Sequence, residues 1–381
     1  MKKILNKIIL FISLFLHIST YLFSRDIEID GKKFKFYSSF LVDEDTVINE
    51  GSIISQALND ITILVVGKAK LIIEPGRNIS KIVPKHDNYD ETDDYKYGLT
   101  SNIVAIGPEA KVVVNSASIY VNCPYSNAIM ALNGAQIELN NATIITKTDY
   151  SKGLVVAFGG KVNINEGTKI YTEGNFSPCL EVYQSDDAIL GINILLNSKG
   201  LGSPLINNLG NAKVELFVSN GKAENSQIII NQDINTVYLD GCQFICNVKD
   251  INEDENTNLN SALNKAGIVL FSKKDDSSGS TSLQSHHCTL KIENEKIVPL
   301  ISCYNIEADI TFDTTQTEFR DIFIKADKNK DLKKETKVHL TLQNTNFKGK
   351  IIAMEDSHID LIADPNILNN GVQIEGKVDF Q

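Results

Sequence analysis

The sequence predicts an all-β protein, a right-handed parallel β-helix that winds as a single-stranded solenoid behind an N-terminal cap. Three observations predict this fold: a repeat of about 25 residues, period-two alternation of apolar residues within it, and asparagine at matching positions. A fixed period of this length is typical of solenoids, in which each turn packs on its neighbours. The equivalent apolar residues, separated by 25, 25, 27, 25 and 23 residues, are Val112, Ile137, Val162, Ile189, Val214 and Val237.

The repeating unit has the pattern of strands rather than of a helix. In the first two turns the pairs Val112/Val114 and Ile137/Leu139 point to one side, while the residue between each pair points to the other. At about 3.3 Å per strand residue, such a repeat is long enough for three short strands and their corners. We therefore expect five of these residues, Val112, Ile137, Val162, Val214 and Val237, to stack in one core, about 4.8 Å apart per turn.

Asparagine recurs at the end of the same predicted strand in three successive turns. Asn115, Asn140 and Asn165 are 25 residues apart. Asparagine tolerates the left-handed backbone that a sharp corner needs, and stacked asparagines can form a ladder of side-chain hydrogen bonds. A ligand-binding surface would be the alternative use of such a row. We interpret the three residues as a structural ladder at a corner.

The first 24 residues have the pattern of an export signal. Lys2, Lys3 and Lys7 precede an apolar run from Ile8 to Leu16, and a loose small-residue cleavage motif ends at Ser24. The alternative is an uncleaved membrane anchor, because the apolar region is nearly long enough to span a bilayer. We expect a cleaved signal, no membrane span after its removal, and a mature protein in the periplasm, at the cell surface or outside the cell.

Residues 25–100 are expected to form the cap and the first irregular turns. They contain an acidic run, for which a Ca²⁺ site is one interpretation and a solvated loop the other. The spacing of its carboxylates does not match an EF-hand, so we predict a solvated loop and no cofactor, with Ca²⁺ as the one ion left open. The candidate ligands are Asp87, Asp90, Asp93 and Asp94.

Residues 101–381 are expected to form the solenoid proper, with polar looped insertions near 249–267, 273–287 and 326–337. In solenoids such loops gather on one side and often form the binding face. The formal net charge of -11 argues against a nucleic-acid partner and against binding to an anionic membrane surface.

Six cysteines occur in the chain, and an exported protein could join them in disulfides in fifteen ways. The expected core is large enough not to need them, so we predict buried free thiols. The run His286-His287-Cys288 does not predict a metal site, because adjacent side chains on a strand point apart. The six are Cys123, Cys179, Cys242, Cys246, Cys288 and Cys303.

Three stretches, NGAQIELNNATIIT, FGGKVNINEGTKIYTEGNFSPCLEVY and LGSPLINN, resemble the repeats of secreted right-handed parallel β-helix proteins of host-associated bacteria. Members of that group are described as adhesin-like, and some as carbohydrate-binding. The resemblance implies an exported surface or secreted binding module. Its partners would be glycans or other molecules of host or bacterial surfaces.

Two other functions remain open. Polygalacturonase-like and pectate-lyase-like β-helices degrade polysaccharides, and Asp186-Asp187 resembles the paired aspartates of the former. No Gly-His-Gly motif follows that pair, and Arg320-Asp321-Ile322 lacks the basic third residue of the Arg-x-Lys motif. A structural surface protein is the other alternative. We predict a non-enzymatic protein with no catalytic residue.

Overall fold

The computed structural model describes residues 23–57, 59–83, 98–249, 266–272, 280–294, 297–318, 322–327, 335–345, 349–364 and 372–380. The predicted signal segment lies outside these ranges except for Phe23 and Ser24, which begin the first strand. The acidic run with Asp87, Asp90, Asp93 and Asp94 also lies outside them, as do Arg320 and Asp321.

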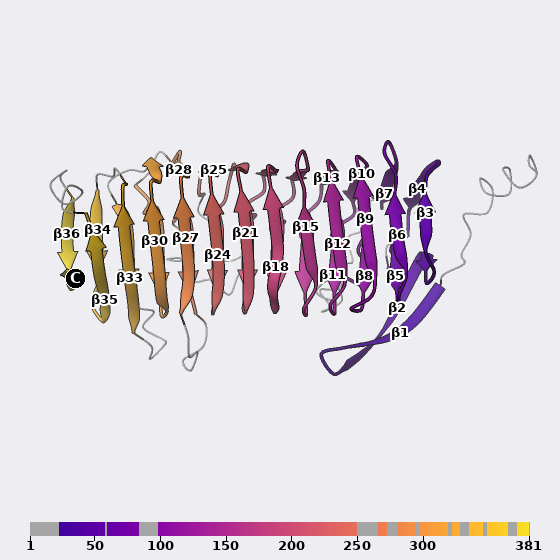
Figure 1. Cartoon of the computed structure of the whole chain (residues 1–381), viewed down its shortest axis with the longest axis horizontal. Coiled ribbons are helices and arrows are strands. Elements are labelled where there is room, and N and C mark those ends of the chain that lie inside the picture. Colours follow the sequence, from indigo (N-terminus) through magenta and orange to yellow (C-terminus); the bar gives the residue numbers. More distant parts are fainter. Residues whose placement is uncertain are drawn as a thin grey trace, which may run out of the picture.

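The described residues form three long sheets that run side by side along the molecule (Figure 1). The chain passes through sheets A, B and C in each regular turn, and each strand pairs in parallel with its equivalent in the next turn. The exception is β1, which pairs antiparallel with β2. The described chain contains no helix long and apolar enough to cross a membrane.

Sheet A contains β1 (Phe23–Ile29), β2 (Lys32–Val42), β5 (Ile61–Val66), β8 (Ile103–Ile106), β11 (Ile129–Leu132), β14 (Leu154–Ala157), β17 (Leu180–Tyr183), β20 (Ile206–Leu209), β23 (Ile229–Gln232), β26 (Ile268–Phe271), β29 (Ile301–Tyr304), β32 (Ile322–Asp327), β34 (Lys350–Ala353) and β36 (Gln373–Gly376). Sheet B contains β3 (Thr46–Ile48), β6 (Lys70–Ile73), β9 (Lys111–Asn115), β12 (Gln136–Asn140), β15 (Lys161–Ile164), β18 (Ser185–Ile192), β21 (Ala212–Phe217), β24 (Asn235–Asp240), β27 (Thr281–His286), β30 (Glu307–Asp313), β33 (Thr336–Gln343), β35 (Ser357–Ala363) and β37 (Val378–Phe380). Sheet C contains β4 (Ser52–Ser55), β7 (Asn78–Ile82), β10 (Ser118–Asn122), β13 (Thr143–Thr146), β16 (Lys169–Thr172), β19 (Leu195–Ser198), β22 (Asn220–Ala223), β25 (Gln243–Cys246), β28 (Thr289–Ile292) and β31 (Gln316–Glu318).

The predicted core column is confirmed. All six apolar residues that define the repeat are buried in one interior cluster, and each pairs in register with the next along sheet B. The column also extends in both directions, to Leu71 before it and to Leu283, Ile310, Leu340 and Leu361 after it. The protein is therefore a parallel β-solenoid. Its right-handed winding stays a prediction.

The one 27-residue step has a local cause. In the pairing of β18 with β21, Ser185 lies opposite Ala212 but Ile189 lies opposite Val214, so β18 carries two additional residues. Asp186 and Asp187 lie within this bulge, both are exposed, and Asp187 has a left-handed backbone with φ of 48°. The bulge absorbs the two residues and returns the following apolar side chains to the core.

The corner between sheets B and C differs in one respect from the prediction. Asn140 donates to Asn115 Oδ1 at 3.0 Å, and Asn165 donates to Asn140 Oδ1 at 2.6 Å, so the side chains form a ladder. The left-handed backbone, however, follows the ladder residue, at Ser116 and Asn141. The reason is that Asn115 and Asn140 are still in their strands, where extended backbone directs the amides along the stack.

The same corner continues through later turns with a left-handed residue in each. Asn193, Val218, His287, Thr314 and Asn344 have φ between 50° and 51°. A β-branched residue in this region is rare because its side chain crowds the backbone. The stacking of neighbouring turns therefore holds Val218 in a conformation that its own side chain disfavours.

The insertion predicted near 273–287 is wrong in its second half, because β27 occupies Thr281–His286 and pairs with β24 and β30. Thr281, Leu283 and Ser285 are buried, which shows that this polar-looking stretch alternates like the other strands of sheet B. Most of the residues predicted as loops near 249–267 and 326–337 lie outside the described residues.

All six cysteines are buried free thiols. Burial raises the pKa of Cys179 and of Cys246 to about 12, from an ordinary value of 9.0. In the unfolded chain these thiols lose their protons near pH 9, whereas in the folded protein they keep them. A group whose folded pKa is raised contributes stability that is lost as the pH rises from the unfolded value toward the folded one.

Stability should therefore fall as the pH rises above 9. The two thiols together should cost about 4 kcal/mol by pH 10.5, about 2 kcal/mol each. Thermal unfolding followed by circular dichroism from pH 8 to pH 10.5 measures this fall. The Cys179→Ala/Cys246→Ala variant should show a shallower pH dependence, whatever its stability at pH 8. If stability fell equally steeply with pH in the parent protein and in the double variant, the raised pKa of Cys179 and Cys246 would not be the cause.

Candidate functional site

The outer face of sheet A carries buried apolar clusters in two places along the solenoid and a more polar segment between them. At its N-terminal end the β1–β2 hairpin covers it, since Ile29 and Phe36 join a buried cluster with Leu64, Val104 and Met130. A second buried cluster lies farther along and includes Ile230, Val269, Phe271 and Tyr304. Between these clusters, the outward side chains of β17 and β20 are mostly polar.

A groove of about 260 Å³ lies over this polar segment. Its volume is near the lower end of the range of pockets that hold small ligands, about 300–1,000 Å³. Side chains from at least five successive turns line it, so the parallel register of sheet A positions them. The lining residues are Tyr150, Lys152, Val155, Ala157, Phe176, Pro178, Glu181, Tyr183, Gly202, Pro204, Asn207, Leu209, Ile230, Gln232 and Phe271.

Three polar side chains in the groove bind one another. Lys152 forms an ion pair with Glu181, and the side chains of both are only 9% exposed. Asn207 donates from Nδ2 to the other carboxylate oxygen of Glu181 at 2.8 Å. Glu181 and Asn207 are neighbours in the register of β17 and β20, which explains why the two side chains meet. The carboxylate is thus held in a fixed orientation between a cation and an amide.

Aromatic side chains stack at the corner that leads into sheet A. The rings of Tyr125 and Tyr150 are 4.7 Å apart with an angle of 2° between them, and those of Tyr150 and Phe176 are 5.1 Å apart at 19°. All three residues have a left-handed backbone, with φ of 58°, 57° and 53°. Such backbone conformations carry strain in non-glycine residues, and here, as at the other corners, the stacking of turns holds them.

Among the described residues the aromatic row ends at Phe176, which is half-buried and lines the groove. The backbone N–H of Tyr150 bonds to the carbonyl of Asn175, and that of Phe176 bonds to the carbonyl of Leu201. The equivalent position in the next turn is therefore Gly202, which also has a left-handed backbone, with φ of 60°. Because glycine has no side chain, no ring stacks on that face of Phe176 from the next turn.

This arrangement is suited to binding a sugar. An aromatic face packs against the apolar C–H face of a pyranose, while a carboxylate and an amide bond to its hydroxyls. Among the described lining residues Glu181 is the one carboxylate, and it is paired with Lys152. Glycoside hydrolysis uses two carboxylates on either side of the scissile bond.

The residues selected from the sequence lie elsewhere. Asn115, Asn140 and Asn165 are on the corner between sheets B and C, and Asp186-Asp187 is in the bulge of sheet B. His286 and His287 point to separate partners, Asp313 and Asp240. The groove was missed because Lys152, Glu181 and Asn207 are more than 25 residues apart. Aligning the turns on their buried columns would have placed Glu181 and Asn207 side by side.

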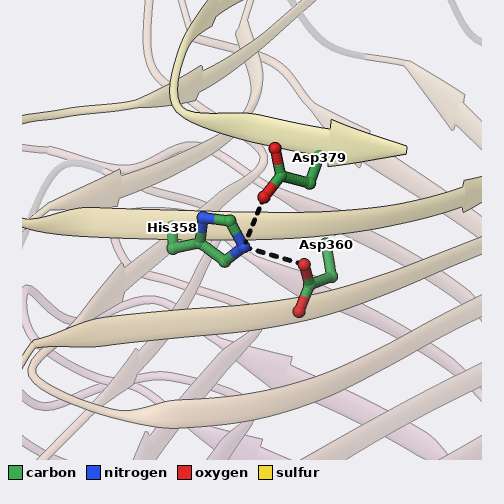
Figure 2. Close-up of side chains that lie close together, drawn as sticks. All are labelled: His358, Asp360 and Asp379. Atoms are coloured by element: carbon green, nitrogen blue, oxygen red, sulfur yellow. Dashed lines mark hydrogen bonds and ion pairs between the residues drawn. The ribbon is translucent and has the colours of Figure 1, made fainter. Parts of the chain in front are cut away.

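One group of described residues has the composition of a metal site. His358, Asp360 and Asp379 each offer a potential ligand atom, and these atoms all lie within 4.8 Å of one another, with both carboxylates beside one nitrogen of His358 (Figure 2). The group is on the outer face of sheet B, near the C-terminal end of the solenoid, and is distinct from the groove on sheet A.

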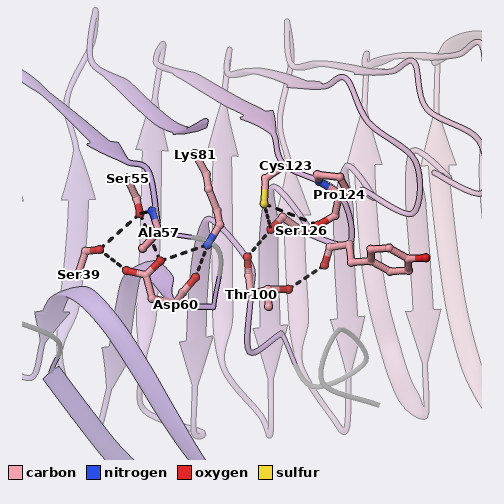
Figure 3. Close-up of polar contacts among 10 residues, drawn as sticks. Ser39, Ser55, Ala57, Asp60, Lys81, Thr100, Cys123, Pro124 and Ser126 are labelled. Atoms are coloured by element: carbon pink, nitrogen blue, oxygen red, sulfur yellow. Dashed lines mark hydrogen bonds and ion pairs between the residues drawn. The ribbon is translucent and has the colours of Figure 1, made fainter. Parts of the chain in front are cut away.

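A further polar cluster lies inside the solenoid near its N-terminal end (Figure 3). Lys81 donates to the backbone carbonyl of Asp60 and is 3.3 Å from its carboxylate, and both side chains are almost completely buried. Ser55 donates to the same carboxylate at 3.2 Å. Burial lowers the pKa of Lys81, and the nearby Asp60 opposes this shift. These groups face the interior, so we interpret the cluster as structural.

No protein-family model, no curated protein and no solved structure matches the chain.

Proposed function

We propose that this parallel β-solenoid is an exported, adhesin-like binding module that holds a neutral glycan in the groove on the outer face of sheet A. The observation that carries the proposal is that Phe176, the last ring of the aromatic row, lines the same groove as the Glu181–Asn207 pair. The signal-like pattern of residues 1–24 and the resemblance to secreted carbohydrate-binding β-helices support export and glycan binding.

The charges of the molecule favour a neutral ligand. In the groove, Lys152 neutralises Glu181, and the net charge of -11 repels acidic polysaccharides such as polyuronates. The ordered carboxylate and amide provide hydrogen bonds without a net charge. A glycan array should therefore give its strongest signals for neutral glycans, and the best of these would be the probe for calorimetry.

Two substitutions test the groove directly. Phe176→Ala should weaken binding of that glycan roughly tenfold, because it removes the stacking surface. Asn207→Ala should weaken it by a similar factor, because a donor beside the buried Glu181 is lost. Isothermal titration calorimetry measures both effects.

Phe217→Ala is the matched control, since Phe217 is a partly exposed aromatic residue that contacts Tyr238 on sheet B. Its affinity for the glycan should equal that of the parent protein. Parent-like affinity in both groove variants, or no neutral glycan bound on the array, would refute the proposal. Cleavage of the bound glycan would instead support the polysaccharide-degrading alternative.

A further inference from the structure

His339, His358, Asp360 and Asp379 lie together on the outer face of sheet B, where β33, β35 and β37 are adjacent. Lys337 is opposite His358 in the register, and Glu307 is 3.8 Å from Nε2 of His339. The register places His339 opposite Asp360, and Asp360 opposite Asp379, so these three form one column across three turns. His358 is two residues before Asp360 on β35 and therefore points to the same face.

The distances bring one imidazole nitrogen between two carboxylates. Nε2 of His358 is 2.8 Å from Oδ1 of Asp360 and 3.3 Å from Oδ2 of Asp379 (Figure 2). Nδ1 of His358 is buried and has no hydrogen-bond partner among the described residues, so the polar contacts of this ring are made through Nε2. Two carboxylates therefore converge on the same ring nitrogen.

His339 orients the central carboxylate from the other side. Its Nδ1 is 3.1 Å from Oδ2 of Asp360, the oxygen that does not face His358. A histidine that binds the distal oxygen of a ligating carboxylate fixes its rotation, as partners around metal ligands commonly do. Asp360 is only 20% exposed, whereas Asp379 is 66% exposed, so solvent reaches the cluster from the side of β37.

We propose that His358, Asp360 and Asp379 bind a divalent first-row transition metal ion, with His339 as a positioning residue. Two ligands about 2.1 Å from a tetrahedral Zn²⁺ ion lie about 3.4 Å apart. The 3.3 Å between His358 and Asp379 matches this separation, and the 2.8 Å between His358 and Asp360 would have to widen when an ion binds. One imidazole with two carboxylates favours Zn²⁺ or a similar ion over Ca²⁺ and Mg²⁺, which prefer oxygen ligands alone. Three protein ligands leave a fourth position for water or an external ligand.

The convergence of two carboxylates distinguishes this cluster from other histidine–aspartate contacts of the protein. His286 is 3.6 Å from Asp313, and His287 is 3.1 Å from Asp240, each with a single carboxylate. Those contacts are ordinary surface pairs. Because His287 directly follows a strand of sheet B and its side chain is exposed, it provides a matched control for the loss of one histidine.

Titration of the full chain with Zn²⁺ by isothermal titration calorimetry tests the site. We expect an ion to bind at this cluster, and His358→Ala or Asp379→Asn to weaken that binding at least tenfold. His287→Ala should bind as tightly as the parent. Co²⁺ in place of Zn²⁺ should give visible absorption bands that are lost in His358→Ala, and His339→Ala should weaken binding less than His358→Ala does.

The proposal fails if the parent protein binds no Zn²⁺, or if His358→Ala retains the affinity and the Co²⁺ spectrum of the parent. Equal losses in His358→Ala and His287→Ala would also overturn it, since they would indicate nonspecific binding by surface histidines. All the variants concern exposed or partly exposed residues of the outer face, so circular dichroism should show the same folded state for each.

Discussion

Replacing Asp60 by alanine should lower the free energy of unfolding by about 3–5 kcal/mol. The substitution leaves Lys81 without its carboxylate in the interior, where the side chains of Lys81 and Asp60 are 0% and 1% exposed. It also removes the acceptor used by Ser39 and Ser55. An unpaired buried charge costs far more than the net contribution of the intact pair, because the charge has no water to solvate it.

Urea denaturation followed by circular dichroism measures this effect, with two comparisons that identify its cause. The double variant Asp60→Leu/Lys81→Met should be more stable than Asp60→Ala, because it removes the charge together with its partner. Glu109→Ala breaks the exposed pair with Lys68, whose atoms are 3.2 Å apart, and should change stability by less than about 1 kcal/mol. A double variant less stable than Asp60→Ala would show that the pair stabilises the fold beyond charge neutralisation.

Alanine in place of Gly200 should destabilise the protein by at least about 3 kcal/mol or prevent its folding. A Cβ atom at this position would overlap the backbone carbonyl of Gly174. One at Gly174 would in turn overlap the backbone carbonyl of Thr148 in the preceding turn. Backbones of successive turns are in contact at this corner, and neither can move without breaking the register of the stack.

Chemical denaturation and the yield of soluble protein report this effect. Gly67→Asn is the matched control: Gly67 has φ of 70°, asparagine tolerates that conformation, and no atom lies within 4 Å of the place that its Cβ would occupy. It should unfold within about 1 kcal/mol of the parent. Parent-like stability of Gly200→Ala would mean that the corner is more open than the structure indicates.

The sequence predicted the part of the fold in which each turn has the same length. The sequence positions of Val112, Ile137 and Val162 are separated by the 25-residue repeat. Their stacking can therefore be predicted from the repeat length alone. The ladder of Asn115 and Asn140 follows from the same count. The repeat length could not predict that the left-handed residue is Ser116 or Asn141 rather than the asparagine before it, because the last strand residue and the corner residue are adjacent in the sequence.

The buried Asp60–Lys81 pair and the His358 cluster could not be predicted in this way, because they depend on the register of turns that differ in length. Asp60 and Lys81 meet within the irregular N-terminal turns, where no repeat is visible in the sequence. His358 and Asp379 are 21 residues apart, a shorter interval than the regular period. In both cases the strand register, which the repeat length does not give, determines which residues are neighbours.

The parallel register also has a consequence for the kinetics of folding. Strands that pair in the regular turns are about 25 residues apart in a chain of 381, roughly 0.07 of its length. That fraction is in the range of helical bundles, whereas most β proteins have values about two to three times as large and fold more slowly. Each completed turn offers a template for the next, so the entropy of closing a loop is nearly the same at every step. We therefore expect folding to begin in the regular middle turns and to spread toward both ends, with the cost of each added turn independent of how many have formed.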